Sequence, residues 1–595
     1  MRRVILSSAL FFVFLFLSPA WCPAEVIEPS LLSLLQSSAP SDDIPVLINL
    51  ADEARLDLIG DSGKKAKRTE IIRALQEKAD LTQQPIMAFL QSRGAKRLKP
   101  LWIRNAVAAT LSSSVIQELK EFPGVGSIAL DSVSRAPVPV LGAPGPYEWN
   151  INTIHAPELW ALGFTGQGIV IAGMDTGVDY LHPDLSSSWR GGTNSWYDPN
   201  NEHASAPFDA HGHGTGTMGV MVGGAAGGSS IGVAPGAQWI AVKIFNDAGV
   251  AADSIIHQGF QWLLDPDGDP KTDDAPDIVN NSWGDEVNGR NLCTLTFKSD
   301  LEVLKSAGIA VVFSAGNLGP SASSSISPAN NPGVYSSGAT DASNTIASFS
   351  SRGPSACDGS IFPTIAAPGV SIRTADLTAG GVITNSYAVA SGTSFAAPHI
   401  AGAMALLYEA FPKLTLSQLE AALMNSALDL GAVGPDSDYG NGLLDVLKAY
   451  HLLTSDKVGV FSDGIWHQDI SGDGAWGGTP PDRLYSFGAG LSGAIPVTGD
   501  WDGSGAAKIG VYQDGIWYLD YDGSGVWGGT PPDRLYSFGA GLSGAIPVTG
   551  DWDGSGAAKI GVYQDGIWYL DYNGSGVWEG SPADRQYSFG GGLSG

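Results

Sequence analysis

The sequence has few cysteines and few basic residues. Three cysteines in 595 residues are too few for a fold that depends on disulfides. The 32 Lys and Arg residues stand against 60 Asp and Glu residues, so the formal net charge is −28. This balance excludes a protein that binds nucleic acid through clustered basic side chains. The length is sufficient for several domains with large cores, and a hydrophobic content of 43% excludes a disordered chain.

The basic residues are concentrated near the N-terminus. Residues 1–135 carry a net charge of +2 and residues 136–595 carry −30. Residues 1–24 begin with two arginines, continue with an apolar run and end in small residues, an order typical of a secretory signal peptide. The alternative is an uncleaved anchor, although the run is short for a membrane span. Because no later run is long and apolar enough to cross a membrane, we expect a secreted, extracellular protein exported by a bacterial route.

Removal of this segment would leave only two cysteines, Cys293 and Cys357. In an oxidising compartment they either form a disulfide or remain two unrelated thiols. Their sequence separation does not decide between these alternatives.

Three further regions differ in pattern. Residues 25–135 predict a small α+β domain, with strands at 44–50, 101–111 and 125–130 and helices at 65–92 and 113–122. Residues 136–148 are rich in proline and glycine, which indicates a linker. Residues 149–453 alternate apolar strands with helical patterns, which predicts an α/β fold with a parallel, doubly wound sheet. We expect strands here at 169–172, 239–244, 278–280 and 309–313, and helices at 253–264 and 295–307.

The last region, residues 456–595, repeats with a period of 51 residues. Gly459, Gly510 and Gly561 begin equivalent stretches, and residues 476–521 are identical to residues 527–572. Each unit offers about four short, aromatic-rich strands between Asp- and Gly-containing turns, which is the size of one propeller blade. About three units fall short of the 4–8 blades of a closed propeller. Either the propeller is truncated or the repeats assemble in an incomplete way.

Four polar residues of the α/β region stand where strands or loops end: Asp175, His213, Asn317 and Ser394. Each alone has an ordinary structural explanation, such as a turn residue, a buried histidine or a helix N-cap. Together they supply a nucleophilic hydroxyl, a base that takes its proton, a carboxylate that orients the base and an amide that binds an oxyanion. Their order Asp, His, Ser along the chain is that of subtilisin.

Several stretches in the same order resemble the motifs of the subtilisin-like serine proteases. They are DTGVDYLHPDL, HGHGTGTMG, VNNSWG, SAGN, AAPGV and GTSFAAPHIAG. The stretches WNINTIHAPELWALGFTGQG and VAPGAQWIAVKIF are similar to the bacillopeptidase F branch. The resemblance implies a peptidase domain over 149–453 that needs no cofactor for its chemistry, with structural calcium as an additional feature of the family.

The resemblance also implies roles for individual residues. Asp175 orients the base, His213 is the general base and acid, Ser394 is the nucleophile, and Asn317 forms the oxyanion hole with the backbone N–H of Ser394. The segments that match the substrate-binding cleft of the family contain Ser282, Trp283, Gly284, Ala315 and Gly316. His211 is a second candidate for the base, although its position in the motif favours His213. The chain departs from the family at Gly216, where a second histidine is usual, and this raises a question about local packing.

Residues 25–135 resemble the inhibitory prodomain that precedes these proteases. This resemblance rests on LWIRNAVAATLS and SSVIQELKEFPGVGSIALD. It implies that the protein is a zymogen whose own prodomain is its inhibitor. We expect the protease to cut itself between Asp131 and Trp149.

Two groups of acidic loops are candidates for cation binding. The sequence does not show which of their residues would be metal ligands. Asp265, Asp267 and Asp269, with Asp273 and Asp274 nearby, form either a calcium loop or a solvated turn. The loops that begin at Asp500 and Asp551 resemble the calcium loops of FG-GAP or VCBS-type repeats, but lysines at 508 and 559 stand where that family places another acid. These repeats are also candidates for binding a surface ligand.

The sequence therefore predicts a secreted serine endopeptidase that acts on proteins or peptides through an acyl-enzyme. The alternative is a catalytically silent scaffold that serves adhesion or binding through its repeats, and the intact set of catalytic residues argues against it.

Overall fold

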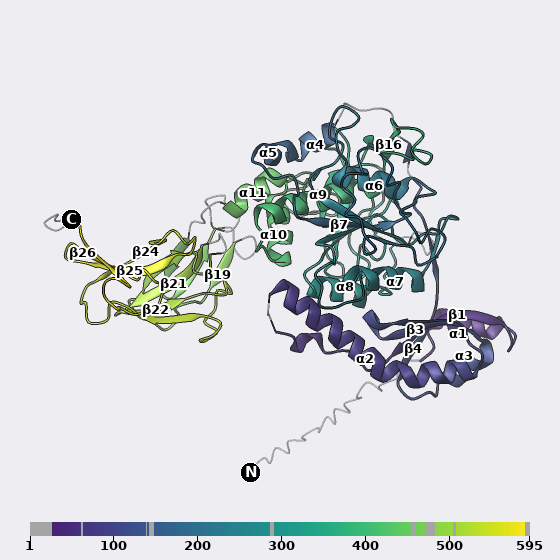
Figure 1. Cartoon of the computed structure of the whole chain (residues 1–595), viewed down its shortest axis with the longest axis horizontal. Coiled ribbons are helices and arrows are strands. Elements are labelled where there is room, and N and C mark those ends of the chain that lie inside the picture. Colours follow the sequence, from purple (N-terminus) through teal and green to yellow (C-terminus); the bar gives the residue numbers. More distant parts are fainter. Residues whose placement is uncertain are drawn as a thin grey trace, which may run out of the picture. The chain divides into compact units, whose positions relative to one another are not determined.

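The computed structural model describes residues 26–60, 63–138, 140–141, 148–285, 291–454, 459–469, 476, 482–503 and 507–589 (Figure 1). The predicted signal peptide and most of the predicted linker lie outside the described residues. The chain divides into two compact units. The first comprises residues up to 53 together with 78–100 and 105–131, and the second comprises 54–77, 101–104 and everything from 132 onward.

The first unit contains a four-stranded sheet in the order β2-β3-β1-β4. β1 lies at its centre and pairs antiparallel with β3 and β4. The strands are β1 (Asp43–Leu50), β2 (Lys96–Leu101), β3 (Ala106–Ser112) and β4 (Val125–Leu130), and the helices are α1 (Pro29–Ser37) and α3 (Ser113–Leu119). The long helix α2 (Lys64–Ser92) belongs to this unit from residue 78 onward, and its residues 64–77 belong to the second unit. Val46, Ile48 and Val107 are fully buried in the core of the first unit. The predicted strands at 44–50 and 125–130 are confirmed, and the predicted helices are present with slightly different ends.

The prediction of one strand over 101–111 is wrong. The structure ends β2 at Leu101, forms a short 3-10 turn over Trp102–Arg104, and starts β3 at Ala106. Asn105 separates the two strands because its backbone adopts a φ of 47°, which an extended strand cannot contain. Its buried side chain is held by Asp52 O at 2.7 Å and Thr82 Oγ1 at 2.9 Å. A short apolar run gives no sign of such a turn, because the bonds that fix it come from distant residues.

The second unit contains a seven-stranded sheet in the order β14-β13-β12-β11-β7-β9-β8. All of its pairings are parallel. The strands are β7 (Val170–Asp175), β8 (Trp196–Tyr197), β9 (Gln238–Lys243), β11 (Ile278–Asn281), β12 (Ala310–Ser314), β13 (Tyr335–Thr340) and β14 (Ile365–Pro368). The four predicted strands are confirmed within two residues at each end except at the end of β7, which extends to Asp175.

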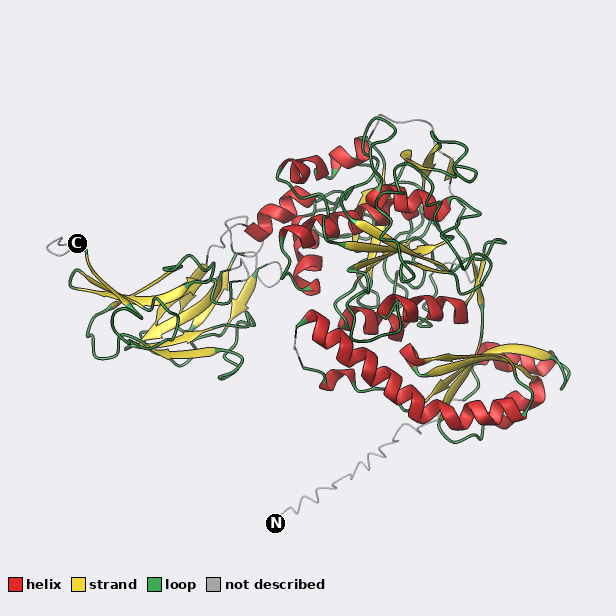
Figure 2. Ribbon diagram, in the orientation of Figure 1, coloured by secondary structure: helices red, strands yellow, loops and turns green. Residues whose placement is uncertain are grey.

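Helices cover both faces of this sheet (Figure 2). They are α6 (His213–Val222) and α9 (Thr393–Ala410) on one face, and α7 (Asp253–Leu264) and α8 (Lys298–Ser306) on the other. Neighbouring strand residues point to opposite faces: Ile171 packs in the core with α6 and α9, and Ala172 packs in the core with α7 and α8. The prediction of a doubly wound α/β fold is therefore confirmed, and α8 begins three residues later than predicted.

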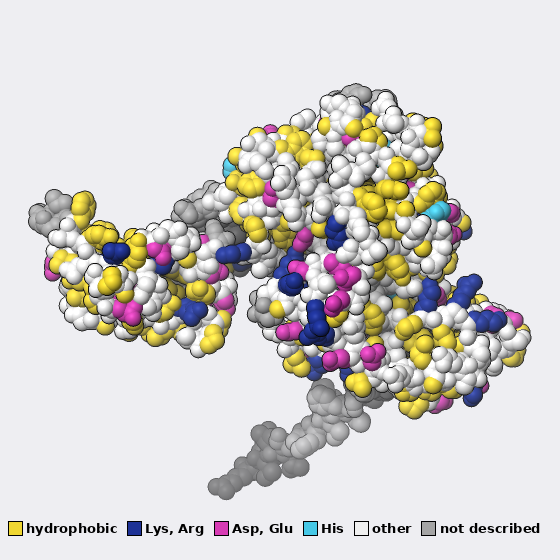
Figure 3. All heavy atoms as spheres, in the orientation of Figure 1, with side chains coloured by type: hydrophobic (Ala, Val, Ile, Leu, Met, Phe, Trp, Pro, Cys, Tyr) yellow, Lys and Arg dark blue, Asp and Glu magenta, His cyan; other side chains and the backbone are white. Residues whose placement is uncertain are grey.

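Smaller elements complete this domain. They are the helices α4 (Trp149–Thr153), α5 (Ala156–Ala161), α10 (Leu416–Ser426) and α11 (Val446–Thr454), and the strands β5 (Val133–Arg135), β6 (Val140–Leu141), β10 (Val250–Ala252), β15 (Ile372–Ala375) and β16 (Tyr387–Ser391). Cys293 and Cys357 form a disulfide, which decides between the two alternatives that the sequence left open. On the face shown in Figure 3, acidic side chains lie among basic ones and form no single continuous patch.

The repeats form small antiparallel sheets, as predicted. The second and third sheets have four strands each, and the first has three strands within the described residues. The strands are β17 (Gly459–Ser462), β18 (Ile465–Gln468) and β19 (Arg483–Tyr485) in the first, β20 (Ile495–Gly499), β21 (Lys508–Gln513), β22 (Ile516–Leu519) and β23 (Arg534–Ser537) in the second, and β24 (Ile546–Gly550), β25 (Lys559–Gln564), β26 (Ile567–Leu570) and β27 (Arg585–Ser588) in the third. Among the described helices of the chain, none is long and apolar enough to cross a membrane.

Candidate active site

The predicted carboxylate and base lie in contact at the carboxyl edge of the parallel sheet. Asp175 is the last residue of β7, and His213 is the first residue of α6. Asp175 Oδ1 lies 2.8 Å from His213 Nδ1 and also accepts a hydrogen bond from Thr176 N at 2.7 Å. Both side chains are almost fully buried. The carboxylate thus fixes a proton on Nδ1 and leaves Nε2 as the basic nitrogen.

The alternative base, His211, is not in this pair. His211 is exposed, and its ring lies near Gly249. The structure therefore separates the two histidines that the motif brought within two residues, and it places His213 against the carboxylate.

Glycines allow α6 to approach the end of β7 closely. A Cβ atom on Gly214 would lie 2.1 Å from Gly177 O, so no larger residue fits at that position. Gly216, where the chain departs from the family, faces Phe395 and Thr374, whose side chains would lie 3.2 and 3.3 Å from a Cβ atom. Gly216 therefore lies in a tightly packed contact between α6 and its neighbours.

Ser394 is the second residue of α9. Its Oγ donates a hydrogen bond to Ser282 O at 3.1 Å, and Ser282 Oγ donates to Ser394 O at 2.7 Å. The next residue, Phe395, places its ring 5.8 Å from the ring of His213. The start of α9 is thus anchored between the end of β11 and the imidazole.

Asn317 follows β12 and contacts the residues that begin α9. Its Oδ1 accepts hydrogen bonds from Thr393 N at 2.9 Å and from Thr393 Oγ1 at 3.0 Å. With Oδ1 held in this way, the Nδ2 group is the part of the amide that remains to donate. A Cβ atom on Gly392 would lie 3.7 Å from both Asn317 Oδ1 and Ser394 N, and 3.8 Å from Asn317 Nδ2. The Asn317 amide and the backbone N–H of Ser394 therefore lie close together at the start of α9.

The residues predicted to line the cleft fall into two segments that face the same side chain. A Cβ atom on either Gly284 or Gly316 would lie 2.5 Å from Ile326 Cδ1. Gly316 N donates a hydrogen bond to Thr393 Oγ1 at 3.1 Å, and Ala315 N donates one to Ser337 O at 3.0 Å. The Trp283 side chain is fully buried and packs edge-to-face against Phe297 and Phe313. Only the backbone of Trp283, and not its buried side chain, is therefore available for contact with a substrate.

Two supporting residues were missed at the sequence level. Thr393 orients the Asn317 amide, as described above. Lys243 is completely buried at the end of β9, and its Nζ donates to Thr176 O at 3.0 Å, beside Asp175. The available signal for Lys243 was a single charge within the apolar run WIAVKIF, which is unusual for a buried parallel strand.

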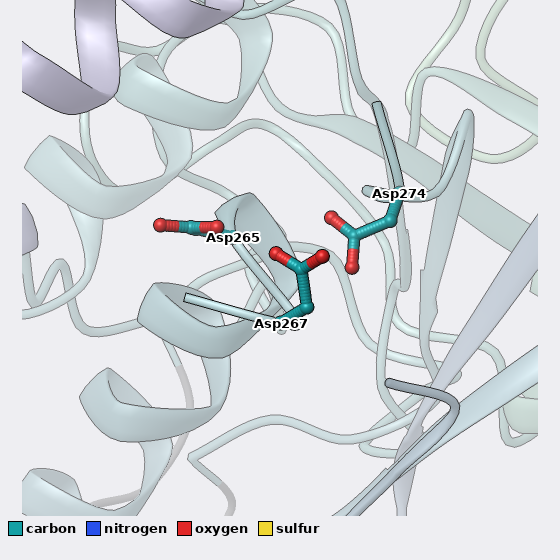
Figure 4. A group of neighbouring side chains, drawn as sticks. All are labelled: Asp265, Asp267 and Asp274. Carbon is teal, nitrogen blue, oxygen red and sulfur yellow. The ribbon is translucent and has the colours of Figure 1, made fainter. Parts of the chain in front are cut away.

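Three of the five acidic residues predicted as a possible calcium loop after α7 lie close together. Asp265, Asp267 and Asp274 bring carboxylate oxygens within 4.8 Å of one another, and Figure 4 shows the carboxylates of Asp267 and Asp274 facing each other. Burial, followed by the charges of its two neighbours, raises the pKa of Asp265 to about 6. Each carboxylate also accepts a hydrogen bond from the protein, for example Asp274 from Asn194 Nδ2 at 2.9 Å. The cluster alone therefore does not identify a metal site.

The comparisons with known proteins agree with this geometry. Residues 166–442 match the model of the subtilase family. The chain is 34% identical over 426 residues to bacillopeptidase F of Bacillus subtilis (strain 168), covering 65% of this chain and 29% of that protein. It is 34% identical over 365 residues to subtilisin E of the same strain, covering 60% of this chain and 84% of that protein. It is 30% identical over 352 residues to minor extracellular protease Epr, also of that strain, covering 57% of this chain and 48% of that protein. The chain belongs to the subtilase family of serine endopeptidases.

Proposed function

We propose that this protein is a secreted serine endopeptidase, made as a zymogen, in which Asp175, His213 and Ser394 form the catalytic triad. The observation that carries the proposal is the 2.8 Å contact of the buried Asp175 carboxylate with His213, whose ring lies 5.8 Å from that of Phe395, the residue after Ser394. Membership of the subtilase family supplies the reaction class. The substrates are proteins or peptides.

The proposed reaction proceeds in two half-reactions. His213 Nε2 takes the proton from Ser394 Oγ as that oxygen bonds to the peptide carbonyl carbon, and Asp175 stabilises the imidazolium. Asn317 Nδ2 and Ser394 N donate to the oxyanion. His213 then gives its proton to the leaving amine, which leaves an acyl-enzyme on Ser394. Water then bonds to the acyl carbon while His213 Nε2 takes one of its protons. The bond from that carbon to Ser394 Oγ breaks, and His213 returns the proton to Oγ as the carboxylic acid leaves. No step needs a cofactor.

The contacts of residues 54–77 and 101–104 support the role of residues 25–135 as a prodomain. These two segments belong to the same compact unit as the peptidase domain. Arg68, which is nearly buried, donates to Asp273 Oδ1 at 3.0 Å. Gln261 Oε1, on α7, accepts a hydrogen bond from Trp102 N at 2.7 Å. A segment that packs on the outer helices of a protease can guide its folding and remain bound after cleavage.

The chain after residue 131 enters the peptidase domain as an extended strand. β5 pairs antiparallel with β10, with Ser134 opposite Ala251. Ala136 N donates to Gly249 O at 2.8 Å, which extends the pairing by one residue. Addition of a strand to an edge is a common way to bind an extended peptide. This geometry supports self-cleavage between Asp131 and Trp149, although residues 142–147 lie outside the described residues.

Export is supported by the residue pattern of 1–24 and by the similarity to Epr, an extracellular protease. Association with a cell surface through the repeats remains part of the proposal. The silent-scaffold alternative is not favoured, because the chain retains the base, the carboxylate, the nucleophile and the oxyanion amide, and the base and carboxylate are in contact.

Replacement of the nucleophile tests the function most directly. A fluorophosphonate probe should label the wild-type protein, and Ser394→Ala should lose both labelling and about 10⁶-fold in kcat on a peptide substrate, because no other hydroxyl takes its place. The unprocessed precursor should accumulate in the same variant, as seen by mass spectrometry.

His213→Ala should show the same loss, and His211→Ala, its matched control, should keep both labelling and processing. Normal labelling or processing in Ser394→Ala would overturn the assignment.

A further inference from the structure

The predicted cation loops of the repeats already hold a cation of the protein. In the second repeat Lys508 forms an ion pair with Asp502, and in the third repeat Lys559 forms an ion pair with Asp553 and lies 4.0 Å from Asp551 Oδ1. A lysine ammonium therefore occupies the place that a metal ion would take. The lysines at 508 and 559 thus pair with the carboxylates of these loops, and we do not assign a metal ion to them.

A different loop of the second repeat gathers three carboxylates. Asp520 and Asp522 follow β22, and Asp533 precedes β23. Their carboxylate oxygens lie within 4.8 Å of one another. Asp520 and Asp533 are almost fully buried, whereas Asp522 is exposed at the rim. Within the part of the chain that the structure describes, none of the three forms an ion pair with a Lys, Arg or His side chain.

One oxygen in this cluster is left without a partner. Asp520 Oδ2 accepts from Gly525 N at 3.0 Å, and both oxygens of Asp533 accept backbone N–H groups, from Tyr521 and Gly528. Asp520 Oδ1 is buried and has no hydrogen-bond partner. A buried carboxylate oxygen without a donor is costly, and a bound cation removes that cost.

The third repeat provides a natural comparison 51 residues later. Its equivalents of Asp520, Asp522 and Asp533 are Asp571, Asn573 and Asp584. Here both oxygens of Asp571 accept backbone hydrogen bonds, from Ser575 N at 3.0 Å and Gly576 N at 2.8 Å. Asn573 Nδ2 donates to Glu579 Oε2 at 2.6 Å. In the third repeat, where Asn573 stands in place of the third acid, these polar side chains are therefore hydrogen-bonded within the protein.

We propose that Asp520, Asp522 and Asp533 form a calcium site in the second repeat, and that the third repeat lacks this site. Three carboxylates supply only oxygen ligands and more negative charge than one divalent ion neutralises, which suits a hard cation with six to eight oxygen ligands. Three carboxylates do not fill such a shell, and water supplies the remaining ligands. The ion offsets the mutual repulsion of the three acids and pairs with Asp520 Oδ1.

Calcium stoichiometry on the full-length chain tests the site. The Ser394→Ala background keeps the chain uncut, and equilibrium dialysis with ⁴⁵Ca²⁺ counts the bound ions. Asp522→Asn, which copies the third repeat, should bind one calcium fewer per chain than the parent. Asn573→Asp, which copies the second repeat, should bind one more.

Asp502→Asn, in the lysine-occupied loop, is the matched control and should leave the count unchanged. Because Asp522 is exposed and Asn is of the same size, Asp522→Asn should fold, which circular dichroism will verify. An unchanged count in folded Asp522→Asn would overturn the site, and so would an equal loss in Asp502→Asn. Calcium bound elsewhere in the chain is common to all variants and does not affect these differences.

Discussion

Asp175 in the peptidase domain and Asp520 in the second repeat are both carboxylates at the end of a strand. They are 3% and 2% exposed, and each accepts a backbone hydrogen bond on one oxygen. What differs is the neighbouring group. Asp175 faces an imidazole at 2.8 Å, so its charge stabilises a protonated base. Asp520 faces two more carboxylates, so its charge favours a metal ion. Burial alone does not determine the chemistry of a carboxylate; its nearest neighbour does.

The largest expected difference between the two regions concerns kcat. Asp175→Asn should lower kcat by about 10⁴-fold, because the amide no longer holds the Nδ1 proton of His213. Asp571→Asn, a buried carboxylate of the third repeat, should leave kcat unchanged. Steady-state kinetics on one peptide substrate measures both. A comparable fall in the two variants would show that Asp175 acts through stability alone.

The elements of both regions were largely predictable, because strands and helices follow local periodicity. The proposed catalytic residues Asp175, His213, Asn317 and Ser394 could also be named from the sequence, since they lie in motifs that are short, continuous stretches of the chain. The supporting residues were not. The role of Thr393 depends on where Asn317 lies 76 residues earlier in the chain, and the disulfide depends on the placement of Cys293 against Cys357.

In the repeats, too, the sequence does not reveal which distant residues come into contact. The loops at Asp500 and Asp551 resemble calcium loops in sequence, but in the structure lysines form ion pairs with their carboxylates. The cluster around Asp520 brings Asp533 back from 13 residues away, across a turn whose path the sequence does not reveal. Local pattern predicts which residues are acidic, and only the fold determines which of them meet.

A second comparison concerns side-chain amides. Asn317→Ala should lower kcat by about 10²–10³-fold with little change in KM, because one donor to the oxyanion is lost. Asn573→Ala in the third repeat also removes one amide hydrogen bond, to Glu579, and should leave kcat unchanged. The two variants are compared on the same substrate. A change in KM alone for Asn317→Ala would show that the amide binds the substrate and not the transition state.

The smallest expected effect concerns the pH dependence of stability in the peptidase domain. His399 is fully buried in α9, where burial lowers its pKa to about 4. Its Nδ1 donates to Phe395 O at 2.7 Å, and its Nε2 accepts from Asn150 Nδ2 at 2.8 Å, so the folded state holds the neutral ring. The stability due to this residue is complete above pH of about 6.5, and it is lost as the pH falls towards 4. The loss should reach about 3 kcal/mol.

Urea unfolding of the Ser394→Ala protein at several pH values between 7 and 4 measures this loss. The same series on His399→Gln should show a flatter dependence, since glutamine does not titrate. If His399→Gln loses stability with falling pH as steeply as its parent, the dependence arises from other groups and not from the buried imidazole.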